Sequence, residues 1–145
     1  MREILFKAKR ITDGKWVEGY YIYHIKRTIC PIGDSVKPQD EQHAIMCDGF
    51  SDWNMPRDTV YYDVDPNTLC QFTGLKDKDG NKIWENDIVK CGRNMMVSWD
   101  NHFSSWCLSR KGWLHKYYFG EAQKPEECAV VGNIFDNPEL LEEYK

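Results

Sequence analysis

The alternation of apolar and charged residues predicts β-strands near the start of the chain. Apolar residues alternate with polar ones from Ile4 to Ala8, and the segment from Trp16 to Tyr23 is rich in aromatic and β-branched residues. Between these segments, the pair Asp13-Gly14 accepts the positive φ that a tight type I′ turn requires. We therefore expect an antiparallel hairpin in this part of the chain.

The following stretch, residues 26–57, has weaker periodicity and contains three prolines. Short strands are expected near His43–Cys47 and Thr59–Val64. Asp65-Pro66 then marks a break, because the residue before proline is disfavoured in the α region and proline suits the first position of a helical turn. We place a division here, between residues 1–66 and 67–145, within one compact unit.

The second half shows short apolar segments separated by polar turns. Such segments, at a spacing of about ten residues, are typical of a small antiparallel barrel or sandwich. At the end of the chain, Asn137-Pro138-Glu139 favours a terminal helix of one to two turns. The expected strands are 69–75, 82–90, 95–99, 103–108, 113–119 and 129–135.

Composition and charge narrow the function. The chain has 145 residues, of which 41% are hydrophobic and 29% charged, and its net charge is −4. This balance supports a folded core and gives no overall attraction to phosphate. Charged residues interrupt the apolar ones in the first ten positions, and the sequence contains no run of 18 or more apolar residues. We expect a cytoplasmic protein with no membrane partner.

Cysteine spacing and the acidic turn both argue against a metal site. Successive cysteines lie 16 to 23 residues apart without a Cys-x-x-Cys pair, so we expect small buried cysteines rather than zinc ligands. The sequence Asp77-Lys78-Asp79-Gly80 has partial calcium-loop spacing, but the first and last EF-hand ligand positions fall on Leu75 and Asn86. We interpret it as a hairpin turn in which Asp77 or Asp79 binds backbone N–H groups. No cofactor is expected.

Three blocks of sequence resemble the YopX family of phage and prophage proteins. They are the start Arg2–Ala8, the long segment Val64–Val89 with TGLKDKDGNKIWENDIV, and Val130–Leu141 with VVGNIFDNPELL. Cys70 and Asn86 depart from the pattern, which has glycine at these positions. The resemblance implies a mostly-β α+β fold, with an α+β N-terminal part followed by an SH3-like barrel. It also implies a phage-borne gene expressed in the cytoplasm of a bacterial host, and it supplies no catalytic residues.

The residues themselves suggest no enzyme. Glu85 and Asp87 are two positions apart, so on a strand they share a face and form a conceivable acid/base pair. We prefer the interpretation that both flank a hairpin and face solvent. The four histidines form no motif with one another or with the cysteines.

One segment, residues 101–120, departs from the acidic balance. It contains no Asp or Glu, three basic residues and six interleaved aromatic ones. Strand alternation places Trp113, His115, Tyr117 and Phe119 on one face, as in a barrel core, and Lys116 and Tyr118 on the other. Three interpretations are open: core packing, a protein-binding patch, or a surface for single-stranded nucleic acid. The nucleic-acid interpretation predicts a site made by Arg110, Lys111, Lys116 and Tyr118.

Two functions follow from the sequence. The first is a non-enzymatic interaction or adaptor protein that binds a host or phage protein, or a second copy of itself. The alternative is a weak single-stranded nucleic-acid-binding module that uses residues 101–120. The two differ in salt dependence, because binding to phosphates weakens steeply with salt.

Overall fold

The computed structural model describes residues 1–142 and divides the chain into two compact units. One unit is Ile4–Leu69. The other consists of Met1–Glu3 together with the chain from Cys70 onward. The change of unit after Leu69 lies three residues beyond the division expected after Pro66.

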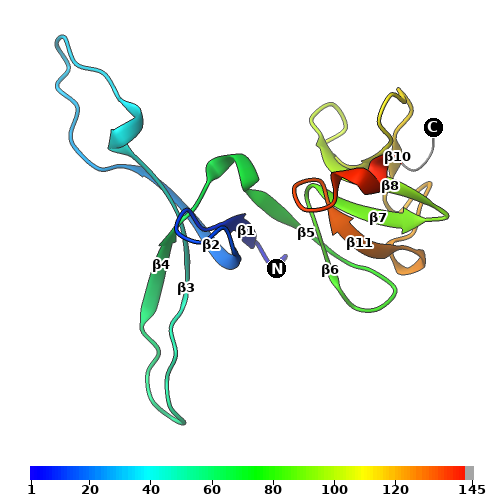
Figure 1. Ribbon diagram of the computed structural model, residues 1–145, viewed down its shortest axis with the longest axis horizontal. Helices are drawn as coiled ribbons and strands as arrows, with labels where there is room; N and C mark the ends of the chain where they lie inside the picture. Colours follow the sequence, from blue (N-terminus) through cyan, green and yellow to red (C-terminus); the bar gives the residue numbers. More distant parts are fainter. Residues whose placement is uncertain (143–145) are drawn as a thin grey trace. The chain divides into compact units, whose positions relative to one another are not determined.

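The unit Ile4–Leu69 is built on antiparallel strands in the order β4-β3-β2-β1 (Figure 1). The expected first hairpin is confirmed, since β1 pairs with β2 and Gly14 has a φ of +69° in the turn. Asp65 caps a 3-10 turn at Pro66–Thr68 by accepting a hydrogen bond from the Asn67 N–H, so the break at Asp65-Pro66 is also confirmed. The strands are β1 (Phe6–Lys9), β2 (Trp16–Ile25), β3 (Glu41–Asp48) and β4 (Thr59–Asp63).

A small apolar core lies on one face of this sheet. Ala8, Ile45 and Val64 are buried there, and larger side chains from β1 and β2 pack around them. Gly19 allows β2 to approach β3 closely, because a Cβ at this position would lie 2.1 Å from the carbonyl oxygen of Met46. A larger residue at position 19 would force the two strands apart.

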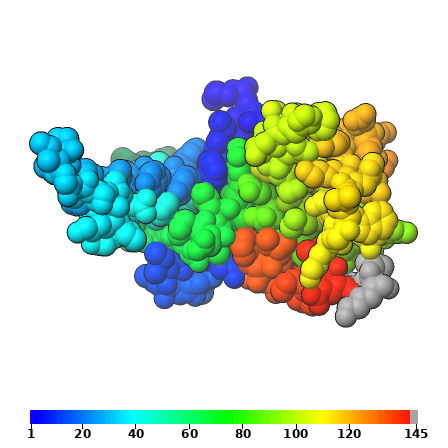
Figure 2. Space-filling view, turned by 90° about the horizontal axis from the view of Figure 1, so that it is seen from above, coloured from blue at the N-terminus to red at the C-terminus, as the bar shows by residue number. Residues whose placement is uncertain are grey.

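Two long connections extend from this unit (Figure 1). Residues 26–40 join β2 to β3, and Figure 2 shows them in light blue to cyan, projecting from their own unit. The guanidinium of Arg27 holds this connection together with ion pairs of 2.8 Å to Asp34 and to Asp40. Residues 49–58 join β3 to β4 and are closed at the base by a hydrogen bond from the Gly49 N–H to the Asp58 carbonyl.

The second unit contains a hairpin and an open five-stranded antiparallel sheet. Strands β5 and β6 pair with each other, and the sheet has the order β10-β9-β8-β7-β11. Its core consists of Ile83, Val89, Met95, Val97, Trp106, Leu108 and Cys128. The strands are β5 (Cys70–Lys76), β6 (Lys82–Trp84), β7 (Asp87–Cys91), β8 (Arg93–Asp100), β9 (Ser105–Ser109), β10 (Tyr117–Tyr118) and β11 (Ala129–Asn133).

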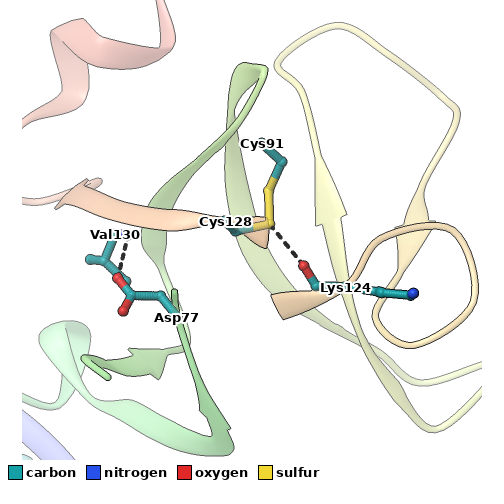
Figure 3. The surroundings of a disulfide bond; sticks show 5 residues. All are labelled: Asp77, Cys91, Lys124, Cys128 and Val130. Atoms are coloured by element: carbon teal, nitrogen blue, oxygen red, sulfur yellow. Dashed lines mark hydrogen bonds between the residues drawn. A yellow bond between two sulfur atoms is a disulfide. The ribbon is translucent and has the colours of Figure 1, made fainter. Parts of the chain in front are cut away.

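Asp77 organises the turn between β5 and β6. Its carboxylate accepts hydrogen bonds from the N–H groups of Asp79 and Asn81 within the turn. It accepts another from the N–H of Val130 on β11 (Figure 3). The hairpin turn expected here is confirmed, with Gly80 at a φ of +80°. The contact with Val130, 53 residues away in sequence, adds a tertiary role that the turn pattern alone does not reveal.

The mostly-β class is confirmed, while finer expectations differ from the structure. β10 and β11 are the edges of an open sheet, so the sheet does not close into the expected SH3-like barrel. The helical segments among residues 1–142 are short 3-10 turns, and no α-helix supports the expected α+β N-terminal part. The terminal helix is one 3-10 turn at Pro138–Leu141; positions 143 and 144 of the expected helix lie outside the described residues.

Two expected strands differ from the structure by more than a shift of their ends. The segment 82–90 forms two strands, because Asn86 has a φ of +67° and turns the chain between β6 and β7. Of the segment 113–119, only Tyr117–Tyr118 pairs as a strand. The irregular backbone before Tyr117 removes the alternation on which the predicted two faces depended.

Candidate functional site

The predicted nucleic-acid residues do not form one cationic face. Lys116 lies 3.3 Å from the carboxylate of Asp100, and the hydroxyl of Tyr118 donates a 2.6 Å hydrogen bond to the same carboxylate. That hydrogen bond lowers the pKa of Asp100 to about 2 and raises the pKa of Tyr118 to about 12. Asp100 thus brings a negative charge beside Lys116, although it precedes the acid-free segment in sequence.

The other two predicted residues lie in different surroundings. Lys111 lies 3.5 Å from the carboxylate of Glu142, with both side chains exposed. The guanidinium of Arg110 stacks over the Trp113 ring at 4.6 Å. Figure 2 shows the segment around residue 110, in yellow, at the surface of its unit. Lys111 and Lys116 therefore each lie beside a carboxylate.

The aromatic residues of segment 101–120 divide between core and surface. Tyr117 and Phe119 pack against the apolar core, as the core interpretation predicts. Phe103 and Trp113 are exposed, at 64% and 48%, and Leu114 is fully exposed. The segment therefore supplies both core and surface residues.

Arg110 and Trp113 also line a cavity of about 450 Å³ next to the disulfide. Arg93, at the start of β8, contributes a second guanidinium to its lining, and Tyr117 contributes a further ring. The described residues that line the cavity include no Asp or Glu. Two cations and two aromatic rings suit a ligand that combines a ring with a negative charge.

A disulfide joins Cys91, at the end of β7, to Cys128, next to β11 (Figure 3). Cys70, Cys107 and Cys128 are buried as expected, whereas Cys47 and Cys91 are half-buried and Cys30 is exposed. The bond between Cys91 and Cys128 was not expected. The two bonded cysteines are 37 residues apart, and β7 and β11 pair directly, which brings them together. The spacing of the cysteines along the sequence could not reveal this disulfide, because the two cysteines meet only when β7 pairs with β11.

We expected Glu85 and Asp87 to face solvent, but in the structure Asp87 is buried and Glu85 is half-buried. Asp87 is 2% exposed, and its carboxylate accepts a hydrogen bond from the Trp84 N–H, which fixes the turn between β6 and β7. Glu85 is half-buried and lines a separate cavity with Trp99 and Trp106. Burial raises the pKa of the Glu85 carboxyl, and a hydrogen bond with the Gln71 backbone opposes the shift. The prediction failed because the Asp87 carboxylate binds the Trp84 N–H in the interior, and Glu85 lines a cavity beside two tryptophan rings.

The connection 49–58 carries three exposed apolar side chains. Phe50 and Trp53 are 92% and 90% exposed, and Met55 is 62% exposed. Sequence reasoning missed this group because the stretch has no periodicity. The available signal was the presence of large apolar residues between Gly49 and Pro56, in a stretch that predicts a loop.

The structure gives no sign of a metal centre or a membrane span in the part that it describes. Within residues 1–142, no three His, Cys, Asp or Glu side chains gather as metal ligands would. No helix there has the length and apolar character to cross a bilayer.

Comparison with known proteins assigns the chain to a family. No curated protein matches the chain. The family model described as YopX protein matches residues 6–142, which is nearly the whole chain and includes the 49–58 connection. The chain belongs to the YopX protein family.

Proposed function

We propose that the chain is a non-enzymatic interaction protein, encoded by a phage or prophage, that binds a protein partner in the bacterial cytoplasm. The observation that carries the proposal is the group of exposed apolar side chains on the 49–58 connection, Phe50, Trp53 and Met55. We call this group the loop patch.

The physical argument concerns the cost of exposing such residues. Large aromatic side chains in water forgo about 1.5–3 kcal/mol each of burial free energy, so a protein surface with several of them in one loop favours burial against a partner. Trp, Phe and Met are also enriched at protein interfaces, and Trp is frequent among the residues that dominate binding energy. The closing hydrogen bond between Gly49 and Asp58 fixes the base of the loop.

The test compares a loop-patch variant with a matched control. In the variant Phe50→Ser/Trp53→Ser we expect the thermal stability of the parent, because neither side chain is buried in the fold. This variant should no longer capture the proteins that the tagged parent captures from bacterial lysate. Sedimentation velocity of the purified parent and variant distinguishes a foreign partner from self-association.

Leu114→Ser is the control, since Leu114 is equally exposed but lies in the other unit. It should leave capture and self-association unchanged. If the parent and Phe50→Ser/Trp53→Ser capture the same proteins and sediment alike, the loop patch is not the binding surface.

Single-stranded nucleic acid is the second candidate, and the cavity with Arg93, Arg110 and Trp113 favours it. Phosphates seek guanidinium groups and bases stack on aromatic rings. A fluorescent oligothymidine should bind at low salt and dissociate as salt is raised, and Arg93→Ala should weaken it. No change in anisotropy at low salt would exclude this candidate.

A further inference from the structure

The unit made of Met1–Glu3 and the chain from Cys70 onward has a second cavity, which borders the core residue Trp106. The cavity measures about 310 Å³ and is lined by Arg2, Gln71, Glu85, Trp99 and Trp106. This volume is at the small end of the range for ligand pockets, about 300–1,000 Å³.

Its aromatic wall is a cross-strand pair. Trp99 on β8 lies opposite Trp106 on β9, and their rings meet edge to face with centroids 5.0 Å apart. Trp106 is 8% exposed and belongs to the core, whereas Trp99 is 41% exposed, although it shares the core-facing side of β8 with Met95 and Val97. The sheet thus offers a partly uncovered indole at the end of its core.

The acidic wall is held rigidly. Glu85 donates its N–H to the Gln71 carbonyl, and the next residue, Asn86, donates its N–H to the Val97 carbonyl, both at 2.9 Å. The buried Asp87 closes the same turn through the Trp84 N–H. A carboxylate half-buried against two indoles, with no ion-pair partner recorded among residues 1–142, is costly unless a cation approaches it.

We propose that this cavity binds the guanidinium or ammonium group of an arginine or lysine side chain presented by a protein partner. The inference rests on the proposed function, because it takes the partner to be a protein. Charge complementarity with Glu85 selects a cation, and the faces of tryptophan are the strongest aromatic partners for one. The two interactions act on the same group, so a neutral side chain of equal shape binds more weakly.

Arg2 of the same chain is the built-in competitor. Its side-chain stem packs over Gly74, where a Cβ would lie 3.5 Å from the Arg2 Cδ, and Arg2 itself lines the cavity. A partner's cation must displace Arg2 or share the cavity with it. Removal of the Arg2 side chain is therefore expected to strengthen binding of a foreign cation.

The experiment uses the full chain and a pair of blocked amino acids, Nα-acetyl-arginine methylamide and its neutral analogue, Nα-acetyl-citrulline methylamide. The indole N–H signals of Trp99 and Trp106 are followed by NMR, with Trp99→Phe and Trp106→Phe to assign them. Saturable shifts are expected for the arginine probe in the millimolar range, about 1–10 mM, and at least about tenfold weaker binding for citrulline.

The variants separate the cavity from other acidic surfaces. Glu85→Gln keeps the size of the side chain and should weaken arginine binding by about tenfold or more. Glu121→Gln, at an exposed glutamate of the same unit, should leave it unchanged, and Arg2→Ala should lower the dissociation constant. Equal binding of arginine and citrulline, equal binding by Glu85→Gln, or no shift at Trp99 in about 10 mM probe would each overturn the proposal.

The outcome is independent of the loop-patch test. Phe50→Ser/Trp53→Ser should bind the arginine probe as the parent does, even where it loses the partner. A failed probe titration with intact, loop-dependent capture would reject the cavity and leave the proposed function standing. The reverse result would reject the loop patch alone.

Discussion

At the scale of single residues, aspartate side chains fix much of the backbone that has no regular secondary structure. Asp77 holds a hairpin turn against β11, Asp87 holds the turn before β7, and Asp65 caps the turn before β5. In each case a carboxylate accepts hydrogen bonds from backbone N–H groups that would otherwise lack partners. The loss of such a carboxylate leaves at least one backbone N–H group without its acceptor, and for Asp77 it leaves three.

Asp77 gives the sharpest prediction of this kind. Asp77→Ala leaves the N–H groups of Asp79, Asn81 and Val130 without their acceptor and should lower the free energy of unfolding by roughly 2–4 kcal/mol. Asp79→Ala, at an exposed neighbour, is the control and should cost less than about 1 kcal/mol. Urea denaturation of both variants measures the difference.

The same residue predicts a pH dependence. Burial alone would raise the pKa of Asp77, but the backbone hydrogen bonds outweigh it and leave the pKa below its usual value. The ionised Asp77 carboxylate therefore stabilises the fold fully above its unfolded-state pKa, about 3.9. This stabilisation is lost as the pH falls through the lower pKa that Asp77 has in the folded state. The stability gap between parent and Asp77→Ala should shrink in that acidic range. A gap that is constant down to the acid transition would contradict this account.

A further prediction concerns the hydrogen bond between Asp100 and Tyr118. Asp100→Asn removes the negative charge that keeps the Tyr118 hydroxyl protonated, so the pKa of Tyr118 should fall from about 12 toward its usual value of about 10. Ultraviolet titration in alkali measures the shift. Asp48→Asn, at an exposed aspartate of the other unit, should not change the titration. An unchanged Tyr118 pKa in Asp100→Asn would show that the hydrogen bond is absent in solution.

At the scale of elements, local sequence patterns predicted hairpins and turns, whereas some strand bounds and side-chain positions depend on tertiary contacts. Alternation and Asp-Gly pairs were enough for the β1–β2 hairpin and for the turn between β5 and β6, because both depend on neighbours in sequence. The positive φ of Asn86 split one expected strand into two. Glu85, next to this residue, lines a cavity with Trp99 on β8 and Trp106 on β9, so its placement depends on tertiary contacts.

The disulfide is the clearest case of an element set by tertiary pairing. In the chain-entropy model, a bond across 37 residues constrains the unfolded chain enough to stabilise the fold by about 3–4 kcal/mol. The variant Cys91→Ser/Cys128→Ser should lose about this much in urea denaturation, and addition of a thiol reductant should lower the parent to the same level.

Cys30→Ser is the matched control, because Cys30 is exposed and unbonded to another cysteine. Its stability should stay within about 0.5 kcal/mol of the parent. Equal stability of the parent and the double serine variant would mean that the bond does not form or does not constrain the unfolded chain.

At the scale of the whole molecule, the two units carry different kinds of surface. The unit Ile4–Leu69 has a small core and long connections with exposed apolar residues, whereas the other unit has the larger core, the disulfide and the two cavities with Arg93 and Glu85. The sequence predicted an interaction protein in general terms. It could not locate the loop patch, because exposure in an aperiodic loop depends on the three-dimensional path of the chain.

Hydroxyl-radical footprinting of the captured complex tests the central claim most directly. Phe50, Trp53 and Met55 are readily oxidised side chains and are exposed in the free protein. We predict that a partner captured from bacterial lysate, or a second copy of the chain, protects all three from oxidation while Leu114 and Trp113 stay as reactive as in the free protein. Full reactivity of the loop patch in the complex, with protection confined to other surfaces, would contradict the account.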